Sequence, residues 1–403
     1  MATQGHDTDI VFLSGKRTPF GTFGGTLKGF SATELGVESA QSALTAAGVS
    51  PDRVDHVIYG NALQTSADAI YLARHVGLGA EVPETVPAVT VNRLCGSGFQ
   101  AITQGAQEIL LGDASVTLCG GTESMSQAPH VVRGARWGDL RLGPAGGQFD
   151  DLLWEALLDT RCDLTMAQTA EELADRYEVK REEADEVAFR SQKRAAAAWE
   201  EGRFLEEVSP VVVKSRRGET RFERDEHLRP DVSMEGLGKL RPYFRKDGLV
   251  TAGNASGIGD GSASVVLASA SWARDEGLKP LGRLVSWAYV GVEPKVMGIG
   301  PAPAIRAALE RAGLSLDEMD LVEVNEAFAP QYKAVEKELG LDPETTNVNG
   351  GAIALTHPLA ASGTRITVHL LHELRRRGGR FAVGSACIGG GQGGAVVVEA
   401  FHD

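Results

Sequence analysis

Cys95 is the first residue whose surroundings suggest chemistry. It lies in the segment AVTVNRLCGSGFQAITQGAQEIL, which is typical of a buried strand, a short turn and a helix that begins near CGSG. A thiol in that place faces free amide N–H groups, and the positive end of the helix dipole can lower its pKa from an ordinary value of about 8.5. The pattern favours a nucleophilic cysteine. The alternative is a small apolar residue at a crowded junction between strand and helix.

His357 lies in a second segment suited to chemistry, NVNGGAIALTHPLAASG. Its small neighbours would let the main chain come close to a ligand, and a histidine there can take a proton from a thiol. The other histidines have less distinctive surroundings. His369 and His372, for example, fall on a predicted helix with Arg375 to Arg377, and we expect them on a solvated face.

Cys387 ends the predicted strand FAVGSAC and is followed by a glycine-rich turn, IGGGQGG. Such a turn exposes several N–H groups that could stabilise a negative oxygen while the adjacent thiol exchanges a proton. A phosphate-binding loop is the alternative, although the chain has no GxxxxGKS/T motif and no GxGxxG before a long helix.

Asn325 and Glu326 end a strand predicted in the same layer, so the Asn325 amide could reach the same cleft. An asparagine at a strand end can equally cap a helix.

The elements that must position these residues occur twice. The segment SAQSALTAAGVSPDRVDHVIYGNA from Ser39 matches AIRAALERAGLSLDEMDLVEVNEA from Ala304 at a constant offset. Later matches keep the same order: Val91-Asn92 with Val348-Asn349, Ser97-Gly98 with Ser362-Gly363, and VTLCG from Val116 with FAVGS from Phe381. We infer an internal duplication in which only the second copy carries the loop with His357. Chance similarity between amphipathic helix-strand units is the alternative.

Alternating helix and strand signals predict an α/β fold. Ser31 and Glu34 form a predicted capping box before an apolar helical stripe that ends at Gly48, and the strand VDHVIYG follows. The alternation favours mainly parallel sheets covered by helices, and the duplication implies two of them. The predicted segments are an N-terminal half, 1–125 plus 253–276, an inserted charged and helical domain, 126–252, and a C-terminal half, 277–403.

Composition limits the possible functions. The net charge of -14 among 403 residues argues against a nucleic-acid partner, which needs clustered positive charge. The four cysteines are far apart, with no metal-ligand spacing, so neither a disulfide framework nor a metal site is expected, and a reducing compartment is favoured. No secretion signal, transit peptide or membrane-spanning run is evident. We expect a cytoplasmic protein, or a mitochondrial matrix protein in a eukaryote.

The motifs NRLCGSG, NEAFAP, GGAIAL-HP and CIGGGQG, in this order, resemble the thiolase family, as do RTPFG near the start and TAGNASG from Thr251. The resemblance covers essentially the whole chain. It is strongest to the 3-ketoacyl-CoA thiolases of fatty-acid oxidation, through DAIYLARHVGL, CGGTESMSQAP, MDLVEVNEAFAPQY and HELRRRGG. It implies duplicated, layered α/β halves with an inserted loop domain over coenzyme A. It also implies an acyltransferase that acts in CoA-dependent thiolysis, in the reverse Claisen condensation, or in both.

The resemblance also implies roles for individual residues. Cys95 would accept the acyl group after activation by His357, and Cys387 would move the proton at the α-carbon of the substrate. Asn325 would hold a water that forms one oxyanion hole with His357, and the main-chain N–H groups of Cys95 and Gly389 would form the other. Residues expected to contact CoA are Arg229 and Ser256; the other basic residues near them are more typical of a solvated hairpin. CoA would be a substrate, with no permanently bound cofactor or metal, and a homodimer or homotetramer is expected.

The sequence departs from the family pattern beside the histidine, where Thr356 and Ala360 replace the usual glycines. If the backbone at 356 has a positive φ, we expect threonine to strain it. Thr165 stands where acetoacetyl-CoA thiolases have a histidine, which favours the oxidation-type subgroup. Two other functions stay open: a ketoacyl synthase-like condensing enzyme, against which CIGGGQG argues, and a catalytically weak acyl-CoA-binding protein on a thiolase scaffold.

Overall fold

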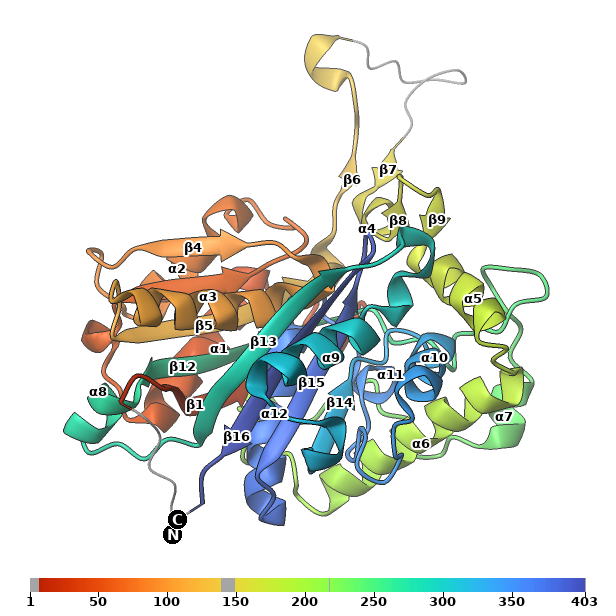
Figure 1. Cartoon of the computed structure of the whole chain (residues 1–403). Helices are drawn as coiled ribbons and strands as arrows, with labels where there is room; N and C mark the ends of the chain where they lie inside the picture. The colour runs from red at the N-terminus through yellow and green to blue at the C-terminus, as the bar shows by residue number, and fades with distance from the viewer. Residues whose placement is uncertain (1–6, 139–148, 217, 403) are drawn as a thin grey trace.

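A single ten-stranded mixed sheet carries both halves of the chain (Figure 1). The computed structural model describes residues 7–138, 149–216 and 218–402. The remaining residues of the three predicted segments lie outside the described part. The strands of the first half are, in spatial order, β4 (Ala88–Val91), β3 (His56–Gly60), β5 (Val116–Ser124), β12 (Gly259–Ser269) and β1 (Ile10–Arg17), with β2 (Gly21–Thr22) beside β12. Those of the second are β13 (Gly282–Gly291), β16 (Gln392–Ala400), β15 (Phe381–Ile388) and β14 (Leu321–Val324).

The prediction of two mainly parallel sheets is wrong. The described strands of both halves form one sheet, and most of its strand pairs are antiparallel. The halves join edge to edge, because β1 pairs with β13 between Ile10 and Phe12. Among the described strands of this sheet, only the pairs β3–β4, β3–β5 and β14–β15 are parallel. One antiparallel pair has a local reason: β15 and β16 are joined by the short glycine turn 389–391, and a tight hairpin can only be antiparallel.

The inserted segment takes the place of the corresponding hairpin turn in the first half. β5 and β12 pair antiparallel, as β15 and β16 do, and Ser124 lies opposite Asp260. Both ends of the long connection 125–258 therefore leave the sheet at one point. Its helices are α4 (Leu152–Ala156), α5 (Met166–Arg176), α6 (Arg181–Glu200) and α7 (Met234–Gly238). Its described strands form the small pairs β6–β7 (His130–Val131, Asp150–Asp151), β8–β9 (Leu158–Asp159, Leu164–Thr165) and β10–β11 (Val211–Ser215, Gly218–Phe222).

Helices cover the sheet in layers, as the predicted fold class requires. The helices α3 (Ser97–Leu111) and α12 (Ala361–Arg377) share one core with strands of both halves, through residues such as Phe99, Val265 and Val396. The outer face of the first half packs against α1 (Ala32–Ala47) and α2 (Leu72–Gly79). That of the second packs against α9 (Pro301–Ala312) and α10 (Ala329–Leu339). The remaining helices are α8 (Ala270–Asp275) and α11 (Ala352–Leu355).

Local signals explain where helices begin and end. The predicted capping box of Ser31 and Glu34 is confirmed at the start of α1, and Gly48 ends that helix with a φ of 66°. All nine residues of β5 are buried, because helices cover both faces of that strand.

None of the described helices is long and apolar enough to cross a membrane.

His369 is buried, so its predicted place on a solvated face is wrong. Its Nδ1 lies 2.8 Å from the Glu207 carboxylate, which also binds Arg17 of β1. Arg17 in turn pairs with Asp225 at 2.7 Å. Burial opposes the ionisation of Glu207, but His369 and Arg17 outweigh it and lower the pKa of Glu207 to about 2. This charged cluster ties the inserted segment to both halves of the sheet.

The helices α3 and α12 cross at two glycines that occupy matching places in the duplication. A Cβ atom at Gly98 would lie 2.5 Å from the Thr364 amide nitrogen and 2.7 Å from the Ala360 oxygen. At Gly363 it would lie 2.6 Å from the Phe99 nitrogen. Each helix therefore presents bare backbone to the other, and a larger residue at either place would force them apart.

We expect Gly98→Ala and Gly363→Ala each to lower the free energy of unfolding by about 1–3 kcal/mol, because the added methyl meets backbone rather than a flexible side chain. Urea unfolding followed by circular dichroism measures this. The control is Gly238→Ala, where a Cβ meets nothing within 4 Å. Unfolding midpoints equal to that of the wild type would contradict the packing assigned to this crossing.

Candidate active site

Cys95 lies in a 3-10 turn, Leu94–Gly96, between β4 and α3. Leu94 adopts a φ of 49°, a left-handed conformation that is uncommon for a branched side chain. Two side chains hold the turn: Asn92 Oδ1 accepts a hydrogen bond from the Leu94 amide at 2.9 Å, and the Ser97 hydroxyl donates to the Leu94 oxygen at 2.7 Å. The thiol is thus placed by a rigid turn that immediately precedes a helix.

Both thiols that line this site have a raised pKa. Burial raises the pKa of Cys95 to about 12, although N–H groups of Gly389 and of Cys95 itself act to lower it. The expectation that the helix lowers the pKa of Cys95 is therefore wrong. Removing the thiolate from water costs more free energy than its hydrogen bonds to the N–H groups recover. Burial likewise raises the pKa of Cys387, and the nearby Cys95 raises it further.

His357 is buried, and each of its ring nitrogens has a hydrogen-bond partner. Its Nδ1 lies 2.6 Å from the Ser362 hydroxyl, which donates its own proton to the Pro358 oxygen at 3.1 Å. The hydroxyl must therefore accept from Nδ1–H, which leaves Nε2 unprotonated. Asn325 Nδ2 donates to that Nε2 at 3.3 Å. Burial, together with the charge of Arg365, lowers the pKa of His357 to about 3, so the ring is a neutral base.

Thr356 confirms the expected strain beside the histidine. Its φ is 83° and its ψ is 172°, a region that only glycine normally occupies. The residue is 1% exposed, packs against Gly259, and its hydroxyl has no hydrogen-bond partner. Ala360 differs, because its φ of -72° suits any residue and its amide donates to Glu123 at 3.1 Å. Only the first of the two departures from the family pattern strains the backbone.

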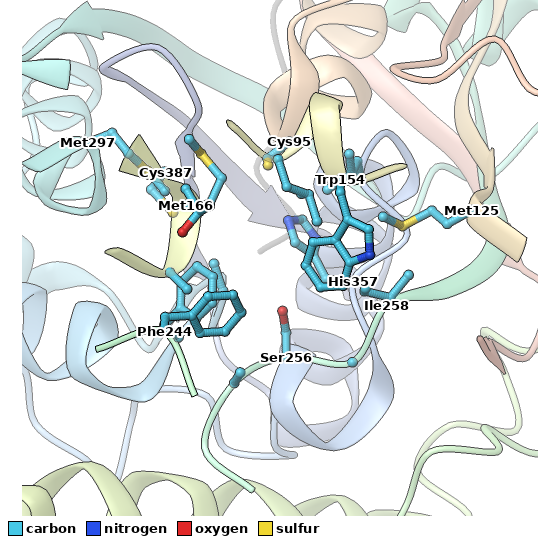
Figure 2. Close-up of a pocket in the computed structure, with 18 residues that line it drawn as sticks. Cys95, Met125, Trp154, Met166, Phe244, Ser256, Ile258, Met297, His357 and Cys387 are labelled. Atoms are coloured by element: carbon cyan, nitrogen blue, oxygen red, sulfur yellow. The ribbon is translucent and has the colours of Figure 1, made fainter. Parts of the chain in front are cut away.

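Cys95, His357 and Cys387 line one pocket (Figure 2). In the close-up the three side chains face the same cavity from three different segments, and Phe244 and Ser256 lie along its lower side. Most of the remaining wall is apolar and comes largely from the inserted segment: Met125, Trp154, Leu157, Met166, Phe244, Ile258, Met297, Phe328 and Leu359. Two thiols and a neutral imidazole thus share a largely apolar space.

The other predicted site residues fall at different distances from this pocket. Ser256 lines it, and an N–H of Gly389 interacts with the Cys95 thiol. Asn325 is fully buried, and its Nδ2 lies 3.3 Å from His357 Nε2. Arg229 is exposed and is not among the lining residues; its main-chain nitrogen donates to Gln192 at 2.7 Å. Of the predicted site residues, Cys95, His357, Cys387 and Ser256 therefore line the pocket, Asn325 and Gly389 contact lining residues, and Arg229 lies apart.

The sequence interpretation missed residues that shape the site. Ser362, which fixes the ring tautomer of His357, was noted only as the match of Ser97 in the duplication. Trp154 and Phe244 come from the inserted segment, which has no counterpart to compare with and no local motif. Thr165 lines the pocket and also caps α5, since its hydroxyl accepts from the Gln168 amide. Among the described residues, no group of His, Cys, Asp and Glu side chains is arranged to hold a metal.

Comparisons with known proteins match this architecture over nearly the whole chain. The family model "Thiolase, N-terminal domain" matches residues 10–271, and "Thiolase, C-terminal domain" matches residues 278–400. The chain belongs to the thiolase family. The mitochondrial 3-ketoacyl-CoA thiolase of Homo sapiens is 56% identical to this thiolase over 390 residues, which cover 97% of this chain and 98% of the human protein.

Solved structures agree with the family assignment. The crystal structure of human mitochondrial 3-ketoacyl-CoA thiolase in complex with CoA has 55% sequence identity and a TM-score of 0.94, and covers 97% of this thiolase and 98% of that chain. The Bacillus anthracis acetyl-CoA acetyltransferase has 48% identity and a TM-score of 0.94, over 97% and 98% of the two chains. Neither the condensing-enzyme alternative nor the binding-protein alternative is favoured by these relatives.

We expect Thr356→Gly to stabilise this thiolase. Relief of about 1–3 kcal/mol of backbone strain exceeds the roughly 0.5–1 kcal/mol that glycine costs by freeing the unfolded chain, so the free energy of unfolding should rise by about 1 kcal/mol. Urea unfolding measures the change. Thr356→Ala is the control, because it removes the unpaired hydroxyl and keeps a Cβ at positive φ. Equal midpoints for the two variants would show that strain is not the cause.

Proposed function

We propose that this thiolase catalyses the CoA-dependent thiolysis of 3-ketoacyl-CoA esters to acetyl-CoA and a shortened acyl-CoA, and the reverse condensation. The observation that carries the proposal is the pocket in which two thiols and an imidazole with an unprotonated Nε2 meet. A thioester on an enzyme cysteine keeps the acyl group reactive for transfer to or from CoA. The reaction therefore needs neither a metal nor a redox cofactor.

In the proposed thiolysis, His357 Nε2 takes the proton of Cys95 as the sulfur attacks the 3-keto carbon. The carbon-carbon bond then breaks, and the electron pair leaves on the acetyl-CoA fragment as an enolate, which takes a proton from Cys387. The resulting Cys387 thiolate can accept the proton of an incoming CoA thiol, which attacks the acyl-Cys95 thioester. Cys95 leaves as the thiolate and recovers the proton held by His357, so the enzyme returns to its initial state.

Two groups of donors are suited to stabilise the negative oxygens of these steps. The N–H groups of Cys95 and Gly389 already interact with the Cys95 thiol. They would form one oxyanion hole, and they require no movement at the moment of reaction. Asn325 would hold a water that, together with protonated His357, forms the other. The side-chain amide of Asn325 already lies 3.3 Å from Nε2 of His357. Nε2 is the atom from which protonated His357 would donate its hydrogen bond.

CoA is proposed as a substrate, with its acyl chain against the apolar wall. Ser256 in the pocket is proposed to contact the pantetheine part, and exposed Arg229 a more distant, charged part. The human mitochondrial 3-ketoacyl-CoA thiolase, which is similar to this chain, has been solved in complex with CoA. The width left by Trp154 and Phe244 would set the preferred acyl length.

We also propose that the chain works as a homodimer or homotetramer in the cytoplasm, or in the mitochondrial matrix of a eukaryote. Strand β4 ends the described sheet, so a second copy could add its own strand there. The leucines Leu110 and Leu111 at the end of α3 are 54% and 76% exposed, which suits burial by a partner. The four free cysteines are compatible with a reducing compartment.

The first test is thiolysis of short, medium and long 3-ketoacyl-CoA esters in the presence of CoA. We expect turnover by the wild type and a loss of at least about a thousandfold in Cys95→Ala, because the acyl acceptor is gone. Cys162→Ala is the control, since that cysteine does not line the pocket. If no ester turned over, or if the Cys95 variant kept its rate, the proposed reaction would be wrong.

A second test follows from the neutral resting pair of Cys95 and His357. Because the pKa of Cys95 is raised to about 12, its thiolate fraction should grow about tenfold for each pH unit across the neutral and mildly alkaline range. Alkylation of Cys95 by iodoacetamide, measured by peptide mass spectrometry, should therefore accelerate throughout that range. A rate that levels off near neutral pH would instead reveal a thiolate in the resting enzyme.

A further inference from the structure

Two buried carboxylates hold the loop that carries His357, one near each end. Glu326 accepts hydrogen bonds near the start of the loop, from Asn347 Nδ2 at 2.9 Å and from the Ile353 amide at 3.3 Å. Glu123 accepts one at its end, from the Ala360 amide at 3.1 Å. Glu326 follows β14 of the second half, whereas Glu123 belongs to β5 of the first half. Glu123 therefore links the loop to the half of the molecule that carries Cys95.

Glu123 is 0% exposed, and its two oxygens accept four hydrogen bonds. Oε1 accepts from Asn61 Nδ2 at 2.9 Å and from the Leu63 amide at 2.9 Å. Oε2 accepts from the amides of Ala62 and Ala360, both at 3.1 Å. One side chain thus fastens the segment after β3 and the histidine loop to the same strand.

The four donors require a carboxylate at this place. Every partner is an N–H group, so both oxygens must accept, and a glutamine of the same shape would turn its own N–H₂ against two of them. Burial raises the pKa of Glu123 to about 7, in spite of the amides of Leu63, Ala360 and Ala62, and Asp260 of β12 adds to this rise. Burying an acid costs free energy of folding. The position of Glu123 is therefore better explained by the two segments that it binds than by a gain in stability.

The position held by Glu123 borders the reacting groups. Leu63, whose amide Glu123 binds, and Leu359, which precedes Ala360, pack in one apolar cluster with Met125 and the Cys95 side chain. The charge of Glu123 also contributes to the raised pKa of Cys95. A shift of the Ala360 amide would move Leu359, Pro358 and His357 in turn, and a displacement of about 1 Å in a reacting group can cost a hundredfold in rate.

We propose that Glu123 is a positioning residue: it clamps the end of the His357 loop to the Cys95 half and thereby aims Nε2 at the reacting sulfur. This inference rests on the proposed function, since it concerns the same pair of groups. Glu123 does not touch substrate in this arrangement and acts only through the backbone that it holds.

The test compares Glu123→Gln with Glu399→Gln. Glu399 is also a buried acid, but it pairs with Arg283 and Arg380 at the opposite end of β16 from the glycine turn. Both variants should unfold at lower urea concentration. Only Glu123→Gln should also lower kcat for thiolysis, by at least about tenfold, with KM for CoA within about twofold of wild type. A Glu123→Gln enzyme that loses stability but keeps its kcat would overturn the proposal.

A second variant tests the single bond to the loop. Ala360→Pro removes the donated N–H and sets the ring Cδ against the Glu123 carboxylate, at a φ of -72° that proline accepts, so this bond to the loop must break. It should lower kcat in the same way, and a wild-type kcat would overturn the proposal even if Glu123→Gln failed to fold.

A spectroscopic measurement separates this proposal from the reaction itself. In selectively ¹⁵N-histidine-labelled protein, His357 should show one fixed tautomer in the wild type and broadened or averaged ring signals in Glu123→Gln, with His357→Asn used for assignment. Unchanged ring signals would overturn the clamp. This result does not depend on turnover, so an absence of thiolysis in the wild type would count against the proposed function alone.

Discussion

The close crossing of α3 and α12 at Gly98 and Gly363 is the constraint on which the site depends. Cys95 lies just before the first helix and His357 just before the second, so the distance between the helices sets the distance between the two groups. Backbone meets backbone at this crossing, because any side chain there would collide with the facing helix. A duplicated fold brings equivalent helix starts together by symmetry, and divergence of the loops then gives them different chemistry.

The same symmetry explains where the pocket wall comes from. In the second half the antiparallel strands beside the site are closed by a short glycine turn, whose Gly389 N–H interacts with the Cys95 thiol. In the first half the equivalent turn is replaced by the long segment 125–258, which supplies Trp154, Met166 and Phe244. One hairpin thus ends in a bare glycine turn beside the pocket, and the other supplies most of the apolar wall. Burial under that wall also raises the pKa of both thiols.

Sequence patterns predicted the local chemistry better than the long-range structure. Cys95, His357 and Cys387 carry distinctive neighbours and do share a pocket, and the strained Thr356 follows from a missing glycine. The antiparallel centre of the sheet escaped prediction because the insertion separates β5 from its hairpin partner. The pKa of Cys95 was misjudged because the helix dipole can be inferred from local sequence, whereas burial depends on elements distant in the chain. His369 was misplaced for the same reason: its partner Glu207 belongs to the insertion.

The strain at Thr356 persists because the loop around it is fixed by other contacts. The His357 amide donates to the Gly257 oxygen at 2.9 Å, and the adjoining helix α11 and the Ala360 amide are held by acids from opposite halves of the molecule. A conformation that costs about 1–3 kcal/mol survives only where its surroundings over-determine it. The loop therefore cannot relax by rotating at residue 356 without breaking bonds to the inserted segment or to β5. Such rigidity suits the neutral His357 imidazole, because its position decides which neighbouring proton it can accept.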